Sequence, residues 1–333
     1  MHPSNATYGL CTYRFKGADY VGLVVKDHVW EINHALRCSD DKMKDSELPI
    51  TEISTMMILL ENWGQLLPKI RTSAAFISEN GLPGSMAEND VDFLSPVPAP
   101  GKMINVGLNF YDHAEEMGMS IPDGFQPSFF WKGDKNCVIG ASQKIIPSSE
   151  FVDWEAELAV VMGRKAKNVP VEQAMDYVAG FTCHNDITDR QLMMLPDGRL
   201  DFYSGKSRDT FGPLGPMIVP VEAVPHPDRL RIRCLLNGEV MQDSGADQMV
   251  WGPAQCISYL SGCTTLLPGD VIALGTGAGT GWTQGISVGP GELSKIIENM
   301  QNGGGIFLRA GDRITVDIPG VGFLQNEVAN NES

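Results

Sequence analysis

The chain opens with short alternations of apolar and polar residues. Between Tyr8 and Ile32 they are interrupted at 16–19 and 26–28 by lysine, glycine and aspartate, residues typical of turns. This pattern predicts small antiparallel strands. Over Thr51 to Ile70 the apolar residues recur every three or four positions, which predicts an amphipathic helix.

A proline-rich segment then separates two parts of the chain. Pro96–Gly101 has a proline at every second position, and prolines this dense exclude both a helix and strand pairing. The segment is therefore expected to be a stiff connector. We predict a small amino-terminal domain over residues 1–95, a linker over 96–101 and a larger domain over 102–333.

Strand-like runs dominate the larger domain, and glycine and proline turns separate them. Helices are expected only at a few places, such as 171–178 and 253–260. The predicted strands include Met103–Val106, Val152–Met162, Gly180–Asn185, Leu230–Leu236, Asp270–Ala273 and Arg313–Ile318. Because no regular alternation of strand and helix appears, we expect a mixed, β-rich α+β fold with mostly antiparallel strands.

Composition narrows the function classes. The net charge of −16 argues against nucleic acid as a partner, because phosphate backbones select basic surfaces. Seven cysteines without a C-x-x-C pair predict a reduced, intracellular protein. No secretion signal is evident, and no apolar run approaches the roughly 18 residues of a membrane span. We therefore expect a cytoplasmic protein with no membrane partner.

Two glutamates interrupt one of the most apolar runs of the chain. Glu155 and Glu157 lie within Val152–Met162, two positions apart. In an extended strand such side chains point to the same side, so both carboxylates would face one cavity. Unpaired charges are costly in apolar surroundings, and the run itself contains no positive residue. A divalent metal ion between the carboxylates would resolve the repulsion.

A histidine and a glutamate three residues apart form a second candidate site. His113 and Glu116 lie on a short helix expected after a strand, and their spacing places them on one helix face. The carboxylate can then orient the imidazole, which suits a general base. A surface histidine making a local ion pair is equally compatible with this segment.

Further polar residues follow the ends of strand-like runs. Asp186 comes directly after Gly180–Asn185, a position that suits a metal ligand or a turn-capping aspartate. His184 would share its face, as support or as packing. Lys206 follows a glycine and can face an anionic substrate or solvent. The glycine-rich segment 274–281 fits neither a dinucleotide loop nor a phosphate loop, and it predicts close approach to a ligand or a sharp turn.

Several of these segments, in this order, resemble the fumarylacetoacetate hydrolase family. The matching segments are Val106–Met117, Asp153–Val161, Asn185–Thr188, Gly205–Ser207, Asp209–Pro216, Asn237–Glu239 and Leu267–Ile272. They extend from about Lys102 to the carboxyl end. The first 95 residues or so resemble the variable amino-terminal domain of many members.

The resemblance implies a fold, a cofactor and a set of site residues. The implied fold is a β-sandwich roll, usually in a homodimer, here with a small amino-terminal α/β domain. The implied cofactor is Mg²⁺ or Mn²⁺, with Ca²⁺ also compatible, which agrees with the preference of carboxylates for hard cations. The implied metal ligands are Glu155, Glu157 and Asp186, the catalytic residues His113, Glu116 and Lys206, and the substrate-binding residues Arg190, Thr276 and Lys132.

The expected partner is a small molecule, and the expected reaction is metal-assisted hydrolysis of a C–C bond in an acylpyruvate or another 1,3-diketo acid. The metal would polarise one carbonyl and stabilise the leaving enolate, while His113 would activate water. Decarboxylation or keto-enol isomerisation of a 2-oxo diacid is the main alternative. More remote alternatives are a non-haem iron oxygenase using His113, His184 and a carboxylate, and a metal-binding protein without activity.

Overall fold

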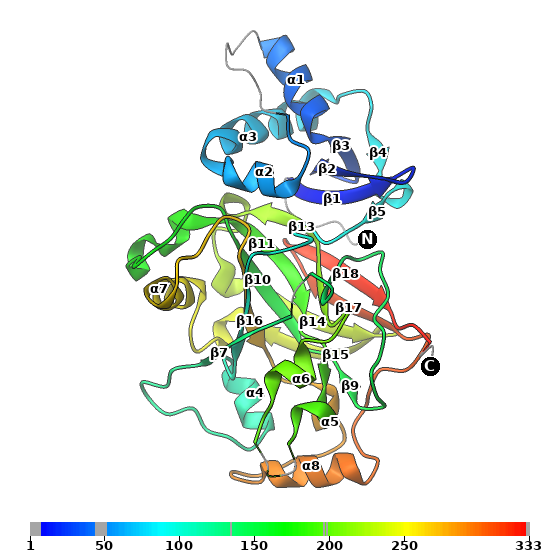
Figure 1. The fold of residues 1–333 in the computed structure, drawn as a ribbon, viewed down its shortest axis with the longest axis vertical. Coiled ribbons are helices and arrows are strands. Elements are labelled where there is room, and N and C mark those ends of the chain that lie inside the picture. The colour runs from blue at the N-terminus through cyan, green and yellow to red at the C-terminus, as the bar shows by residue number, and fades with distance from the viewer. Residues whose placement is uncertain (1–7, 44–51, 134, 196, 198, 331–333) are drawn as a thin grey trace.

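One large mixed sheet runs through the molecule in the computed structural model (Figure 1), which describes residues 8–43, 52–133, 135–195, 197 and 199–330. Its twelve strands follow the order β4-β3-β2-β1-β13-β11-β10-β16-β6-β7, with β5 paired to β1 and β8 to β13. Only the pairs β6–β16 and β8–β13 are parallel. The strands are β1 (Gly9–Phe15), β2 (Ala18–Val25), β3 (His28–Glu31), β4 (Met86–Ala87), β5 (Asp92–Phe93), β6 (Met103–Gly107), β7 (Ser128–Trp131), β8 (Val138–Ile139), β10 (Ala156–Met162), β11 (Val178–Asn185), β13 (Gly212–Pro220) and β16 (Val271–Thr276).

A second sheet packs on the carboxyl-terminal part of the first. It has the order β15-β14-β17-β18, with β14 at Arg231–Leu236, β15 at Glu239–Gly245, β17 at Arg313–Ile318 and β18 at Gly322–Glu327. Leu158 and Val160 of β10 share one buried cluster with Ile232 of this second sheet. The large mixed sheet and the mostly antiparallel pairing confirm the predicted fold class.

Strand β10 is buried on both faces, which explains why its sequence is apolar apart from Glu157. Leu158 and Val160 pack toward the second sheet. The residues that alternate with them, Ala159 and Val161, belong to a different cluster with Trp63 and Ile70 of the amino-terminal helices. Those helices are α1 (Ile32–Met43), α2 (Met56–Glu61) and α3 (Trp63–Asn80), drawn in blue at the top of Figure 1.

The single helix predicted over Thr51–Ile70 is two helices in the structure. Thr51 itself lies outside the described residues, and α2 and α3 meet at Asn62. The side-chain amide of Asn62 donates to the backbone carbonyl of Ile58 at 2.8 Å. This bond competes with the regular backbone hydrogen bonds of the helix. Apolar spacing alone does not register this local competition.

The remaining helices surround the lower end of the large sheet in Figure 1. They are α4 (Tyr111–Glu116), α5 (Arg190–Met193), α6 (Phe202–Lys206) and α8 (Leu293–Gln301), while α7 (Pro253–Cys263) lies to one side. The helix predicted at 171–178 is a 3-10 helix over Val171–Tyr177. Within the described part of the chain, no helix is both long enough and apolar enough to cross a membrane.

The strand predicted over Val152–Met162 is interrupted just before β10. A short strand β9 (Val152–Asp153) pairs with β12 (Thr188–Asp189), and Glu155 lies between β9 and β10. The carbonyl of Glu155 accepts from the Asp186 N–H at 2.9 Å, and its N–H donates to the Asn185 side chain at 3.0 Å. These bonds replace the regular strand pairing and tie Glu155 to the end of β11.

The amino-terminal strands are joined to the rest of the large sheet by hydrogen bonds. Strand β1 pairs with β13 through Leu10 and Ile218, and the Tyr8 hydroxyl donates to Glu222 at 2.6 Å. The segment 96–101 contains neither helix nor strand, as its prolines predicted. The division into domains at this segment stays a prediction.

Candidate active site

Three buried carboxylates meet where β10 and β11 approach the lower helices. Glu155, Glu157 and Asp186 each offer an oxygen, and these atoms all lie within 4.8 Å of one another. Glu157 is on β10 and pairs in register with His184 of β11 and Thr276 of β16. The structure thus brings together the three residues predicted as ligands, although Glu155 reaches the site from outside a regular strand.

Positive side chains from distant segments accompany two of these carboxylates. The Lys206 ammonium donates to Glu155 at 2.7 Å and to Asp186 at 2.8 Å. Lys132 forms a buried ion pair with Asp186, and the Arg190 guanidinium lies 2.8 Å from Glu155 as a fourth ion pair. The counter-charge that the apolar run itself lacks is therefore partly supplied by the fold.

These ion pairs determine which carboxylates are ionised. Burial alone would raise the pKa of Glu155, but Lys206 and Arg190 outweigh it and hold that pKa below its ordinary value. Burial opposes ionisation of Asp186 too, and Lys132 and Lys206 keep its pKa low. Both carboxylates are therefore charged at neutral pH and able to bind a cation.

Glu157 is the carboxylate left without a cationic partner in the described part of the chain. Its oxygen accepts one backbone N–H, from Gly275 at 3.0 Å. Burial, followed by the charges of Asp186 and Glu155, raises its pKa well above the ordinary value. An under-compensated carboxylate beside two ionised ones, with only oxygen donors in the set, fits a hard divalent cation such as Mg²⁺ or Mn²⁺.

We expect the affinity for Mn²⁺ to rise with pH and binding to release a proton. The reason is that Glu157 holds a proton below its raised pKa, and a metal ion must displace that proton. Below that pKa, the affinity should fall about tenfold for each pH unit. Isothermal titration calorimetry in buffers of different ionisation enthalpy measures the released proton directly. Affinity independent of pH between 5 and 8 would contradict this expectation.

His113 and Glu116 form a direct pair on α4. The Nδ1 atom of His113 lies 2.6 Å from Glu116 Oε1, so the carboxylate fixes Nδ1 as the protonated nitrogen and leaves Nε2 free to accept a proton. Burial alone would raise the pKa of Glu116, but its bonds with His113, Gly279 and Thr283 hold it below the ordinary value. The pair has the arrangement of a general base with its orienting carboxylate, and its catalytic role stays a prediction.

The glycine-rich segment after β16 holds this pair in place. The Gly279 N–H donates to Glu116 at 2.7 Å, and the hydroxyls of Thr280 and Thr283 lie 3.2 and 2.9 Å from the same carboxylate. Gly279 has a φ of +102°, and a Cβ there would lie 2.1 Å from the Met241 carbonyl oxygen. This segment therefore binds a protein carboxylate, and its approach to a ligand stays a prediction.

Replacing Gly279 with alanine is therefore expected to lower turnover about 10–100-fold, the usual effect of disturbing a supporting hydrogen bond. The new methyl group must push the segment away from Met241, which removes the N–H bond to Glu116. Gly285→Ala is the matched control, because its φ is +77° but nothing lies within 4 Å of its added Cβ. An equal loss of turnover in the two variants would show that backbone strain alone is responsible for the loss.

Asp153 is a buried acid that the sequence analysis assigned no role. It accepts the Nε–H of Arg190 at 2.8 Å and the backbone N–H groups of Gly281 and Trp282 at 2.6 and 3.1 Å. The Arg190 guanidinium in turn lies 4.6 Å from the centre of the Trp282 ring. Asp153 therefore ties the predicted substrate-binding arginine to the glycine-rich segment. Its position two residues before Glu155, within the same apolar run, was the available signal.

A cavity of about 340 Å³ opens beside the carboxylates. Glu116, Glu157 and Lys132 lie behind its surface, and Lys132 is fully buried against Asp186 and the carbonyl of Lys206. The Thr276 hydroxyl donates to the Ala156 carbonyl at 3.0 Å, so its contact with a substrate stays a prediction. The polar residues that line the cavity are His113, Ser128, Glu155, Asp186, Arg190, Lys206 and Thr276.

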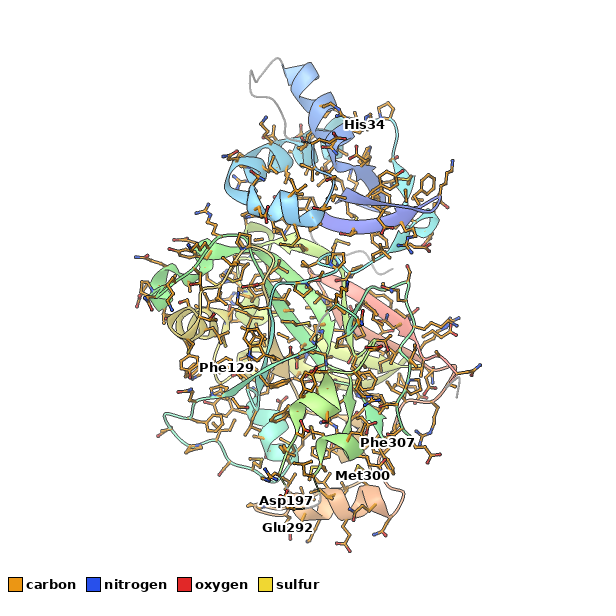
Figure 2. All side chains as sticks on the ribbon, in the orientation of Figure 1. His34, Phe129, Asp197, Glu292, Met300 and Phe307 are labelled. Atoms are coloured by element: carbon orange, nitrogen blue, oxygen red, sulfur yellow. The ribbon has the colours of Figure 1, made fainter. Side chains whose placement is uncertain are left out.

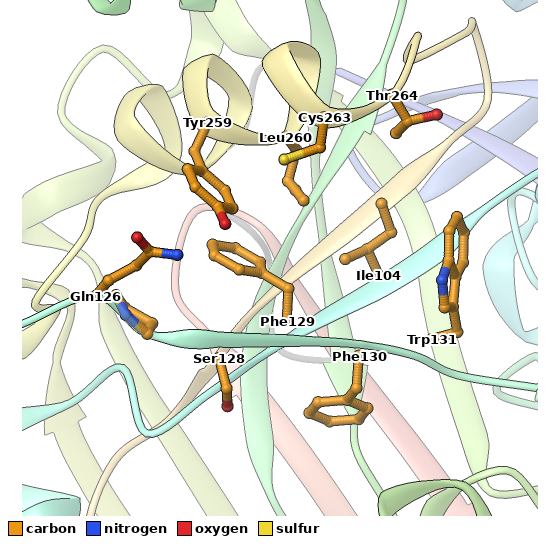
Figure 3. A pocket seen from close by; sticks show the side chains of 11 residues that line it. Ile104, Gln126, Ser128, Phe129, Phe130, Trp131, Tyr259, Leu260, Cys263 and Thr264 are labelled. Carbon is orange, nitrogen blue, oxygen red and sulfur yellow. The ribbon is translucent and has the colours of Figure 1, made fainter.

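A second hollow, of about 310 Å³, lies on the other side of β7 (Figure 3). Phe129 and Trp131 of β7 and Tyr259 of α7 line it, and Phe130 borders both this hollow and the first cavity. None of the described residues lining it is an acid, a lysine, an arginine or a histidine. The acid–base and metal-ligand groups belong to the first cavity.

His184 is unsuited to the oxygenase alternative. Its Nδ1 lies 2.8 Å from the Pro213 carbonyl, and its Nε2 lies 3.3 Å from the Asn105 amide. Both ring nitrogens thus have partners, and burial lowers its pKa to about 4, so the ring is neutral at neutral pH. Among the described residues, the acids and histidines close enough to hold one ion are Glu155, Glu157 and Asp186, so the structure does not gather His113, His184 and a carboxylate into one such group.

Comparison with known proteins extends these observations. The sequence pattern of the family described as "Fumarylacetoacetate (FAA) hydrolase C-terminal" matches residues 102–329. The chain is 36% identical over 276 residues to the mitochondrial oxaloacetate tautomerase FAHD2A of Bos taurus, covering 82% of this chain and 79% of that protein.

Solved structures share the fold over almost the whole chain. A putative HpcE protein from Mycobacterium smegmatis superposes with a TM-score of 0.72 at 29% identity, covering 96% of this chain and 98% of the other. Maleylpyruvate hydrolase from Sphingobium sp. SYK-6, in complex with manganese(II) and pyruvate, gives a TM-score of 0.68 at 25% identity, with the same coverage. The sequence match and these likenesses agree, and the chain belongs to the fumarylacetoacetate hydrolase family.

Proposed function

We propose that this protein is a divalent-metal-dependent enzyme that hydrolyses the C–C bond between the acyl group and the pyruvate part of a 2,4-dioxo acid. The observation that carries the proposal is that His113, oriented by Glu116, lines the same cavity as Glu155 and Asp186. A molecule bound in this cavity would therefore contact both the proposed base and two of the proposed metal ligands.

A cation held by Glu155, Glu157 and Asp186 would polarise the 2-oxo group and stabilise negative charge on the departing fragment. His113 Nε2 takes a proton from water, and the water oxygen attacks the acyl carbonyl. The bond between the acyl carbon and the methylene carbon then breaks, with its electron pair staying on the methylene. His113 returns the proton to that carbon, giving a carboxylic acid and pyruvate.

The cationic residues of the cavity support binding of the substrate carboxylate. Lys206 and Arg190 both line the metal end of the cavity, where a charge-assisted bond to a carboxylate is strong. Lys132, fully buried behind Asp186, keeps that ligand ionised. The roles of these residues toward the substrate are part of the proposal.

Keto-enol tautomerisation of a 2-oxo diacid is the second candidate, because the relative that is 36% identical is named an oxaloacetate tautomerase. The same base can move a proton between carbon and oxygen without attack by water. Chromatography of products formed with Mn²⁺ separates the two candidates. Two organic acids from a 2,4-dioxo acid support hydrolysis, whereas faster interconversion of enol and keto forms without cleavage would replace it with tautomerisation.

A further inference from the structure

The cavity beside the carboxylates is lined by a few charged residues and by a larger number of apolar ones. His113, Glu155, Asp186, Arg190 and Lys206 gather at the metal end. Most of the other lining side chains are apolar and together form what we call the apolar wall: Met117, Met193, Met194, Leu200, Trp282 and Leu293. The reacting part of a 2-oxo acid needs only the first of these two regions.

The apolar wall belongs to a separate small core below the large sheet. Met117, Met193 and Trp282 are buried in one cluster with Met300 and Phe307, and Figure 2 shows the last two at the lower end of the molecule. The wall is therefore supported from behind by α8 and the segment that follows it. A supported wall presents its apolar atoms to whatever enters the cavity.

The mouth of the cavity is apolar as well. Met119 and Leu200 line it and are 40% and 46% exposed. Exposed apolar side chains at the rim of a cavity lose contact with water when a ligand covers them. The apolar region thus reaches from the buried cluster to solvent.

Arg190, which contacts Trp282 of this region, is already paired with Asp153 and Glu155. Arg199 donates to Asp197 at 2.8 Å, and Lys295 donates to Glu292 at 2.5 Å. These last two pairs belong to the lower end of the molecule, where Figure 2 labels both acids, and none of their members lines the cavity. A carboxylate placed against the wall would therefore lose its hydration without gaining a partner, which is costly.

We propose that the apolar wall binds an uncharged alkyl or aryl tail on the acyl side of the substrate. This inference rests on the proposed function, because it places the 2-oxo acid head at the carboxylates and directs the acyl group toward the wall. The methionines suit such a site, since their unbranched, polarisable side chains adapt to tails of different shape. Substrates ending in a second carboxylate are disfavoured.

The test begins with binding, so that it does not depend on turnover. Unreactive, unbranched 2-oxo acids of increasing length are titrated into the Mn²⁺-loaded protein by calorimetry. Each added methylene is expected to lower Kd about fourfold until the wall is covered. A 2-oxo diacid of the same length, with a terminal carboxylate, should bind at least about tenfold more weakly than the monoacid.

Leu200→Arg provides the decisive variant, because it places a cation at the mouth on a side chain that is already 46% exposed. The variant should bind the diacid more tightly than wild type and the long monoacid less tightly. Leu267→Arg is the matched control: Leu267 is 44% exposed and does not line the cavity, so its preference should equal that of wild type.

Turnover of 2,4-dioxo acids with a methyl or a butyl acyl group separates this inference from the proposed function. Higher kcat/KM for the butyl compound supports both. If both compounds are cleaved with equal kcat/KM, and Kd does not change with tail length, the inference is wrong and the proposed function stays intact. Absence of cleavage with tail-dependent binding overturns the hydrolysis and supports the apolar site. If neither cleavage nor tail-dependent binding is observed, the proposed hydrolysis and the apolar site are both wrong.

Discussion

Glu157→Gln is expected to abolish turnover and to remove the response of the protein to Mn²⁺. Glu157 is the one carboxylate of the three with no cationic partner in the described part of the chain, so its oxygens do not have to leave a cation in order to bind a metal ion. In wild type, Mn²⁺ at a hundredfold excess over Kd should stabilise the fold by about 2.7 kcal/mol. The variant should show no such gain, and its activity should fall at least about a thousandfold.

Without metal, the same variant should be more stable than wild type above acidic pH. A carboxyl whose folded pKa is raised binds more protons in the native than in the unfolded state, so its contribution to stability falls as pH rises. The loss begins near the ordinary glutamate pKa of about 4.3 and is complete above the raised pKa. Glutamine has no proton to lose, and the difference between the two melting curves isolates this effect.

Glu222→Gln is a suitable control for both effects. Glu222 forms an ion pair with Arg71 and accepts from Tyr8, away from the cavity. Its variant should keep the Mn²⁺ response and the activity. If Glu157→Gln retained both the response and the turnover, the three carboxylates would not be the metal site and the proposed function would lose its basis.

His113→Asn should lower hydrolysis by about 10²–10⁴-fold while Mn²⁺ binding stays unchanged. The substitution removes the proton acceptor that Glu116 orients, and none of the three carboxylates that would hold the metal is altered. Rates of product formation and calorimetric Mn²⁺ affinity are measured on the same preparation. The two readouts separate loss of the base from loss of the cation.

The rate of hydrolysis by Glu116→Gln should lie between those of wild type and His113→Asn. The imidazole remains in this variant, but its tautomer is no longer fixed by a charge. The exposed His226 supplies a control, since His226→Asn changes a histidine that does not line the cavity. Unaltered hydrolysis in His113→Asn would exclude His113 as the base and direct attention to the tautomerisation alternative.

Short sequence patterns predicted the elements whose backbone follows a regular hydrogen-bond pattern from end to end. Arg313–Ile318 is a strand with the predicted bounds, because its backbone follows the regular pairing of the second sheet. The strand predicted from Val152 is interrupted at Glu155, because the backbone of Glu155 forms hydrogen bonds with the distant residues Asn185 and Asp186. Such competition depends on which segments the fold brings together.

The candidate site shows the same limit. The spacing of Glu155 and Glu157 and the pair His113–Glu116 are short-range features, and the structure brings each pair together, although Glu155 lies outside the strand that its spacing predicted. The partners of these residues come from far along the chain. The N–H of Gly279 holds Glu116 across 163 positions. A carboxylate and its distant support carry no shared local signal, so only the folded structure joins them.

The separation of the two regions of the cavity has a consequence for how such a protein evolves. Glu157 and the neighbouring Ala159 belong to a strand packed on both faces, where almost any substitution damages the core. Leu200 and Leu293 are on the peripheral wall and are only partly buried, so changes there cost the fold little. Mutational drift can therefore alter the acyl group that is accepted while the chemistry at the metal end is inherited intact.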